Sequence, residues 1–329
     1  MDERTKTAVD RLSRGPWASA TFARGSARLV AATLLLGHSA TLGAQTPGRE
    51  PAVVELPSST RAMALGGAYQ LGANDVDLLF GNPALLQRAR GMSLGVHVLG
   101  GASLAATLAT AVEGFGGGVG AGLQVMEHRR SAPEALSGAR SGGLDPFLRE
   151  GVIGVSELAA TLGYGRNLFG TRVGVAAKLV DQRIQSHRDA SWALDLGVSR
   201  DLEGFTLGVA LQDLGADLDV NGPADLPTRV TVGAGRYGYP LGPLDLGAAA
   251  AVTLRDDGEV VPGGGIELGY YPVTGRTFVA RVGARRVPEG EALPLTFGGA
   301  YWGDNLVLEY AFQAVDGEDG VHRVSVGWR

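Results

Sequence analysis

The sequence contains no cysteine, so no disulfide can hold the chain together and stability must come from backbone pairing and burial. Lysine is nearly absent as well: Lys6 and Lys178 are the only two in 329 residues, and the formal net charge is -5. This balance offers no basic face for nucleic acid, so no nucleic-acid partner is expected. Aromatic residues make up only 6% of the chain, yet 45% is hydrophobic, which argues against a disordered protein.

Long hydrophobic runs are missing too, except near the N-terminus. Several arginines in the first 28 residues precede the apolar run from Leu29 to Leu36, and small residues follow up to Ala44. This order is typical of a secretory signal peptide, so residues 1–44 are predicted to be removed. The run is too short for a membrane-spanning helix, which needs about 20 apolar residues. No comparable run follows it, so the mature chain is expected to have no transmembrane helix.

The chain does contain many glycines, 52 in all. From about Met92 onward, apolar residues alternate regularly with small or polar ones. In the stretch TRVGVAAKLV, for example, Val173 and Val175 fall on one face, whereas Arg172 and Gly174 fall on the other. Alternation of period two predicts β-strands. The pattern repeats to the end of the chain, so an all-β fold is predicted.

The expected strands are about 9 to 13 residues long, which is more than a soluble strand needs and matches a tilted crossing of a bilayer. One face is uniformly apolar and the other holds glycine, alanine and small polar groups. A soluble sandwich would instead expose lysine and glutamate. We count about fourteen strands in residues 91–329, so the prediction is an up-and-down antiparallel transmembrane β-barrel with its apolar face toward lipid.

Connections support this prediction, because barrels of the bacterial outer membrane have short periplasmic turns and longer external loops. The two longest connections, 129–151 and 214–225, fall at one end of the predicted barrel, and tight turns such as RNLFGT and YPVTG fall at the other. An even number of strands also closes a barrel without leaving an unpaired edge in lipid.

Two kinds of residue point inward in this register. Glycines such as Gly174, Gly197, Gly208, Gly247 and Gly283 either make room in the lumen or ease strand curvature. The predicted lumen-facing charges are Lys178, Asp195, Asp245, Glu267, Arg281, Arg285 and Glu309. These charges either pair with one another or give the lumen selectivity for ions or solutes.

The stretch RAMALGGAYQLGANDVDLLFGNPALL, residues 61–86, is the most distinctive part of the chain. Its notable residues are Arg61, Gly66, Gly67, Asp75, Asn82, Pro83 and Ala84. Together with the later strands 192–216 and 226–235 and the end of the chain, this stretch resembles the PorV/PorQ family within the FadL-like outer-membrane barrel superfamily. The resemblance implies a fourteen-stranded barrel in which residues 45–90 fold inward as a plug or hatch. The alternative is that residues 45–90 form a capped periplasmic loop.

The resemblance also implies function and location. A PorV-like barrel in the outer membrane of a Gram-negative-type bacterium, surrounded by its lipid, would act as a partner or carrier for secretion-machinery proteins or exported cargo, and would have a wet or occupied lumen. A FadL-like barrel would instead take up hydrophobic small molecules, through an apolar pocket behind the hatch and a lateral opening or kinked strand. The loop 129–151 is expected to serve either as a lid or as a partner surface.

No motif for catalysis, cofactor or metal stands out. GAGRYG, with Gly233, Gly235 and Gly238, matches a dinucleotide fingerprint but lacks the following helix that this site requires. DLDVNG, from Asp217, has the spacing that opens a calcium loop, but Thr228 stands where the bidentate glutamate belongs, which leaves a weak site at best. We therefore expect no enzyme activity and no cofactor.

Overall fold

The computed structural model describes residues 51–68, 75–99, 103–131, 152–220, 223–286, 294–314 and 320–328. The predicted signal peptide, residues 1–44, lies outside the described residues, as does most of the loop 129–151. None of the helices in the described part is long and apolar enough to cross a membrane.

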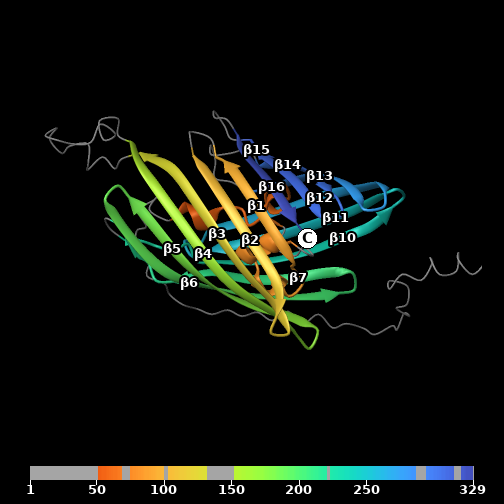
Figure 1. The fold of residues 1–329 in the computed structure, drawn as a ribbon, viewed down its shortest axis with the longest axis horizontal. Helices are drawn as coiled ribbons and strands as arrows, with labels where there is room; N and C mark the ends of the chain where they lie inside the picture. The colour runs from red at the N-terminus through yellow and green to blue at the C-terminus, as the bar shows by residue number, and fades with distance from the viewer. Residues whose placement is uncertain are drawn as a thin grey trace, which may run out of the picture. The chain divides into compact units, whose positions relative to one another are not determined.

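Fourteen strands form a closed antiparallel barrel, as the alternation predicted (Figure 1). Each strand pairs with its neighbours in the chain, and β1 closes the ring against β16, where Leu94 lies opposite Val326. The barrel strands are β1 (Gly91–Val98), β2 (Leu104–Gly114), β3 (Gly117–Ser131), β4 (Val152–Leu168), β5 (Thr171–Ile184), β6 (His187–Leu202), β7 (Phe205–Gly215), β10 (Arg229–Leu241), β11 (Leu244–Arg255), β12 (Val260–Val273), β13 (Arg276–Arg285), β14 (Leu295–Trp302), β15 (Leu306–Gln313) and β16 (Val321–Trp328).

Strand length varies more than the 9 to 13 residues expected. The extremes are 8 residues, in β1 for example, and 17 in β4. The long strands β3 to β6 are consecutive and pair along most of their length. The hairpins on that side therefore extend further than those around β14 to β16.

The two ends of the barrel differ. At one end, which we call the turn end, two or three residues join β2 to β3, β4 to β5, β6 to β7, β10 to β11, β12 to β13 and β14 to β15. At the other end, the loop end, the connections are mostly longer, and the one after β7 carries a small hairpin of β8 (Leu218–Asp219) and β9 (Pro223–Ala224). Gly91, which opens β1, lies at the turn end.

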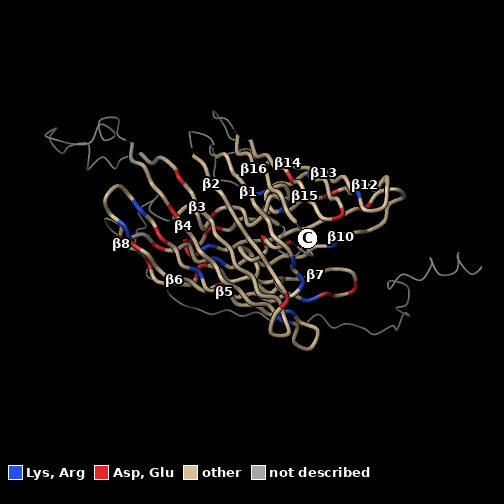
Figure 2. The backbone as a smooth tube through the Cα atoms, viewed as in Figure 1, with Lys and Arg blue, Asp and Glu red and all other residues tan. Residues whose placement is uncertain are grey.

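The outer face is apolar and exposed. Large hydrophobic side chains such as Leu94, Leu196, Val209 and Ile266 are each more than 40% exposed, and long stretches of strand carry no charge (Figure 2). A soluble sandwich would bury these side chains between two sheets, so the structure excludes that alternative. An exposed apolar band of this extent is expected where a barrel meets hydrocarbon.

The barrel wall is regular over most of its pairings. The registers of β1–β2, β2–β3 and β3–β4 run without a shift. Three irregularities are present among the described pairs: in β6–β7 between Leu194 and Leu196, in β10–β11 between Arg236 and Tyr239, and in β12–β13 between Tyr270 and Val273.

Inside the ring, residues 51–68 and 75–90 form short helical segments, drawn in red and orange in Figure 1. These are η1 (Ala52–Glu55), α2 (Thr60–Ala64), η2 (Val76–Phe80) and η3 (Pro83–Gln87). Most of their side chains are buried, and they contact strands on several sides of the barrel. We call residues 51–68 and 75–90 the plug, which describes their place in the lumen.

Candidate functional site

The plug begins near the loop end of the barrel. The Val53 amide donates a 2.7 Å hydrogen bond to Glu157, a buried residue near the loop end of β4, and Gln182 donates to the same carboxylate. Arg229, the first residue of β10, donates to the Val54 carbonyl. These bonds satisfy backbone groups of η1 that would otherwise be buried without partners. The plug therefore spans the lumen lengthwise, from η1 at the loop end to β1 at the turn end.

The helix α2 packs against the wall formed by β13 to β16 and fixes Arg61 inside the lumen. Ser59 caps the helix by accepting from the Ala62 amide at 2.9 Å. The Arg61 guanidinium binds Glu267 on β12 through two nitrogens and lies over the ring of Tyr237, 4.7 Å from its centroid. It lies 5.4 Å from the ring centroid of Trp302 as well. Arg61 thus connects the plug to the wall by an ion pair and by cation–π contacts.

The ion pair at Arg61 is one end of a chain of charges along the wall. Arg281 on β13 lies 3.2 Å from Glu267 and 2.8 Å from Glu309 on β15. Four of the charged residues singled out in the sequence, counting Arg61, therefore form one network of alternating sign. The attraction between charges paired in this way offsets part of the penalty for removing them from water.

The Gly66-Gly67 pair ends α2 with a turn in which both residues have positive φ, 63° and 79°. Gly66 lies so close to β13 that a Cβ atom would fall 2.3 Å from the Ala284 carbonyl oxygen. Glycines on the wall allow the same approach from the other side, since a Cβ on Gly283 would lie 2.4 Å from the Gly66 nitrogen. Only glycine fits at such contacts.

The Asn82-Pro83-Ala84 motif sits against the opposite wall. Asn82 is fully buried and its side-chain oxygen accepts from the Ala84 amide at 3.1 Å, while Pro83 opens η3. A Cβ on Gly174 would lie 2.3 Å from the Ala84 nitrogen, and one on Gly197 would lie 2.1 Å from the Asn82 oxygen. The sequence offered two explanations for the inward glycines, room in the lumen or strand curvature. At Gly174 and Gly197 the room is used for close packing against the plug.

Acidic residues of the plug face the β1–β16 wall. Asp75 accepts from the Asp77 amide at 3.0 Å, and Asp77 accepts from the Ser93 hydroxyl at 3.1 Å. Arg323 of β16 lies 3.6 Å from the Asp77 carboxylate. Burial, together with the nearby Asp75 carboxylate, raises the pKa of Asp77. Asp77 and Arg323 were not among the predicted site residues, although Arg323 falls on the inward face of its strand.

Lys178 and Asp195 form a second network, nearer the loop end. The Lys178 ammonium lies 3.1 Å from Asp195 and also contacts Asp213, and Arg229 lies 3.3 Å from Asp213. Asp213 was missed in the sequence because it breaks the alternation: Gln212 and Asp213 are consecutive and both are buried. Asp213 has a φ of 59°, at the irregularity between β6 and β7.

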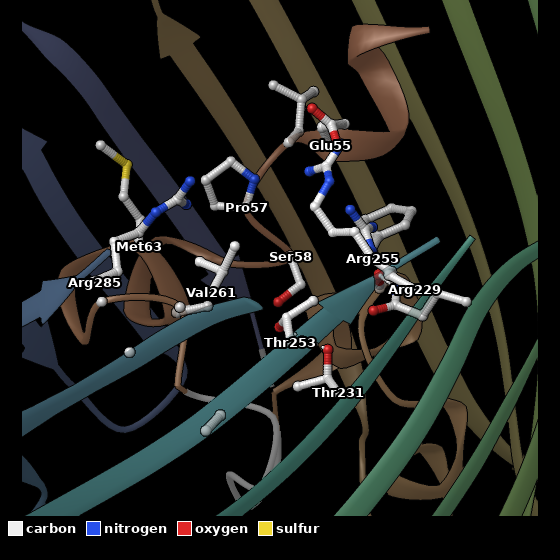
Figure 3. A pocket seen from close by; sticks show the side chains of 18 of the residues that line it. Glu55, Pro57, Ser58, Met63, Arg229, Thr231, Thr253, Arg255, Val261 and Arg285 are labelled. Carbon is white, nitrogen blue, oxygen red and sulfur yellow. Dashed lines mark hydrogen bonds and ion pairs between the residues drawn. The ribbon is translucent and has the colours of Figure 1, made fainter. Parts of the chain in front are cut away.

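Two cavities flank α2. The loop-end cavity, of about 140 Å³, is lined by Ala62 and Met63 of α2 and by Arg285 of β13, among other residues (Figure 3). The turn-end cavity, of about 370 Å³, is lined by Arg61 and Asp245, among others. Consecutive residues of α2 therefore face opposite cavities. This helix and the ion pair of Arg61 form the partition between them.

The predicted residues thus fall into separate groups. Arg61, Glu267, Arg281 and Glu309 come together, as do Lys178 and Asp195, whereas Asp245 and Arg285 lie in different cavities. Asn221 of the possible calcium loop lies outside the described residues. In the described part of the chain no group of three or more acidic or histidine side chains could hold a metal.

No protein-family model matches the chain, and no curated protein matches its sequence. Solved structures do match its fold. The Pseudomonas putida toluene transporter TodX is 13% identical with a TM-score of 0.51, covering 81% of this chain and 95% of its own. A Pseudomonas aeruginosa FadL homologue is 11% identical, with a TM-score of 0.53 and coverages of 82% and 98%. The CymD monoaromatic hydrocarbon channel is 12% identical, with a TM-score of 0.52 and coverages of 82% and 96%.

The fold is therefore that of the FadL-like outer-membrane barrels. At these identities the similarity establishes the architecture alone. Nothing in the comparisons supports the narrower assignment to the PorV/PorQ group.

Proposed function

We propose that the protein is an outer-membrane channel for the uptake of small molecules with a hydrophobic part, closed at rest by its plug. The observation that carries this proposal is the pair of cavities on the two sides of α2, inside a closed barrel whose outer face is apolar. TodX is a toluene transporter and CymD is a monoaromatic hydrocarbon channel, which supports a hydrophobic solute for this chain. We place this chain in the outer membrane of a Gram-negative-type bacterium, after removal of residues 1–44, and propose no enzymatic step.

The plug supplies the closed state in this proposal. Arg61 faces the turn-end cavity and Met63 faces the loop-end cavity, so a solute that moves from one to the other must pass α2. The ion pair between Arg61 and Glu267 holds the helix in that position. A rearrangement of α2, and not of the barrel wall, would open the path.

Flux measurements test this proposal directly. The full chain is reconstituted in liposomes, and the entry of labelled toluene is compared for the wild type, Arg61→Ala and Arg88→Ala. Arg88 is a matched control, since its pair with Asp201 is about half exposed and lies outside the partition. The proposal expects protein-dependent toluene entry that is faster in Arg61→Ala and unchanged in Arg88→Ala. Toluene entry no faster than in protein-free liposomes would refute it.

A second function, as a partner or carrier in protein secretion, is favoured by two observations. The Asn82-Pro83-Ala84 stretch resembles the PorV/PorQ family, and the loop-end cavity has a polar lining, which suits a wet lumen better than an apolar pocket. No strand among β1 to β4 is interrupted, as a lateral opening there would require. Co-purification of the full chain from native membranes with secretion-machinery subunits would support this function over uptake.

A further inference from the structure

The loop-end cavity is strongly cationic for a space inside a barrel. Three arginines line it, Arg229, Arg255 and Arg285, and Glu55 is the one acidic residue in the lining. The other polar lining groups include the hydroxyls of Ser58, Thr231 and Thr253 and the amide of Gln212. A lumen that passes only hydrocarbon has no use for this composition, because each partly buried guanidinium carries a desolvation cost.

The three arginines differ in their partners. Arg255 pairs with Glu55 at 2.5 Å, and Arg229 pairs with Asp213 at 3.3 Å and donates to the Val54 carbonyl. Arg285 has no ion pair among the residues that the structure describes, and its Nε atom is buried without a hydrogen-bond partner. Figure 3 shows the Arg285 side chain apart from the Glu55–Arg255 pair. One guanidinium charge of the cavity is therefore not neutralised by the protein.

A second polar group lacks a partner in the same cavity. The Ser58 hydroxyl is buried and has no hydrogen-bond partner in the described part of the chain. The neighbouring hydroxyls of Thr231 and Thr253 satisfy each other at 2.9 Å, and Gln212 donates to the Phe80 carbonyl. Buried polar groups are rarely left unsatisfied, so this exception needs an explanation, which a polar ligand in the cavity would supply.

The size of the cavity limits that ligand. At about 140 Å³ it compares with an engineered cavity of ~150 Å³ that admits benzene. We propose that this cavity binds small organic carboxylates about as large as a single ring, with the carboxylate on Arg285 and the Ser58 hydroxyl. A guanidinium presents paired N–H donors that match the two oxygens of a carboxylate. This proposal rests on the proposed uptake function and adds a substrate class to it: amphipathic anions, alongside neutral hydrocarbons.

Benzoate binding to the full chain in detergent tests the proposal. Titration calorimetry compares the wild type with Arg285→Gln, using benzyl alcohol as an uncharged probe of nearly the same shape. The matched control is Arg286→Gln, because Arg286 is the next residue, is exposed and donates to the Val260 carbonyl. We expect saturable benzoate binding, weakened at least about tenfold in Arg285→Gln, as a lost charge-assisted hydrogen bond implies. Arg286→Gln should stay within about twofold of the wild type.

Thermal unfolding separates a binding role for Arg285 from a structural one. Because no carboxylate pairs with Arg285, its replacement removes a buried charge and should leave the unfolding temperature unchanged or raised. Equal benzoate affinity in the wild type and Arg285→Gln, benzyl alcohol binding as tight as benzoate, or a clearly lowered unfolding temperature of Arg285→Gln would each overturn the proposal.

The outcomes also separate this inference from the channel function. Toluene entry without any Arg285-dependent benzoate binding refutes the carboxylate site and leaves the channel intact. Arg285-dependent benzoate binding without entry of either molecule supports the site and refutes the channel.

Discussion

Arg61 of the plug and Glu267 of β12, more than 200 residues apart in the chain, form a two-pronged ion pair inside the lumen. The two partners are not equivalent, since Glu267 also contacts Arg281 at 3.2 Å. After removal of Arg61, the Glu267 carboxylate keeps a cationic neighbour. Removal of the Glu267 carboxylate takes an anionic neighbour from two guanidinium groups at once, those of Arg61 and Arg281.

This asymmetry predicts different stabilities for the two single variants. Loss of one member of a buried pair costs about 3–5 kcal/mol when it leaves the other uncompensated. Glu267→Gln affects two arginines, whereas Arg61→Met leaves Glu267 paired with Arg281, so Glu267→Gln should cost clearly more than Arg61→Met. The measurement is the unfolding of the purified barrel in detergent, followed by the mobility shift between folded and unfolded protein. Equal losses in the two variants would show that Arg281 does not compensate Glu267.

The inward glycines that touch the plug give a second prediction. A methyl group at Gly197 would meet the Asn82 side-chain oxygen at 2.1 Å, so Gly197→Ala should displace η3 and weaken the docking of the plug. Gly154 on β4 is the matched control, because nothing lies within 4 Å of a Cβ there. Limited proteolysis of the plug should become faster in Gly197→Ala and not in Gly154→Ala. Equal cleavage of both variants would contradict the close contact.

The barrel itself was predictable because apolar residues and small or polar residues alternate with period two along its strands. On β5 and β6, Lys178 and Asp195 are buried, whereas Val175, Leu196 and Val198 are exposed. The partner Asp213 was not predictable, because the shift between β6 and β7 turns two consecutive residues inward. A local irregularity of this kind is set by tertiary contacts and leaves no periodic signal.

The contacts between the plug and the barrel wall were even less accessible from the sequence. Period-two patterns identify strands, but the contacts of Asn82 with Gly174 and Gly197 join segments about a hundred residues apart. The glycines were visible in the sequence, but either room in the lumen or strand curvature could explain them. Only the close approach of two backbones distinguishes packing from curvature, and that distance appears once the chain is folded.

Asp77 makes plug stability dependent on pH. Burial, followed by the nearby Asp75 carboxylate, raises the pKa of Asp77 from 3.8 to about 8. A carboxyl whose pKa is raised on folding stabilises the folded state in its protonated form. That stabilisation is fully present below about pH 3.8 and is lost as the pH rises through about 8. The Arg323 guanidinium, 3.6 Å away, limits the loss without abolishing it.

The expected result is a lower unfolding temperature for the wild type at about pH 9 than at about pH 5. The difference should be smaller in Asp77→Asn, in which Asp75, whose pKa burial raises to about 6, keeps part of the dependence. Asp304→Asn, at an exposed position of the turn end, should keep the wild-type dependence. A wild-type profile that is flat between these pH values, or one that Asp77→Asn does not flatten, would rule out Asp77 as its source.

The network around Lys178 predicts a rescue that depends on which carboxylate is neutralised. Lys178→Met leaves Asp195 and Asp213 buried without the ammonium, and should cost about 3–5 kcal/mol. Asp213 retains Arg229 at 3.3 Å, whereas Asp195 keeps no cation among the residues that the structure describes. A second substitution, Asp195→Asn, should therefore recover part of the lost stability, and Asp213→Asn should recover less because it leaves Arg229 unpaired. Unfolding of the two double variants, compared with Lys178→Met alone, measures this difference. A larger recovery from Asp213→Asn would mean that Arg229 does not stabilise Asp213.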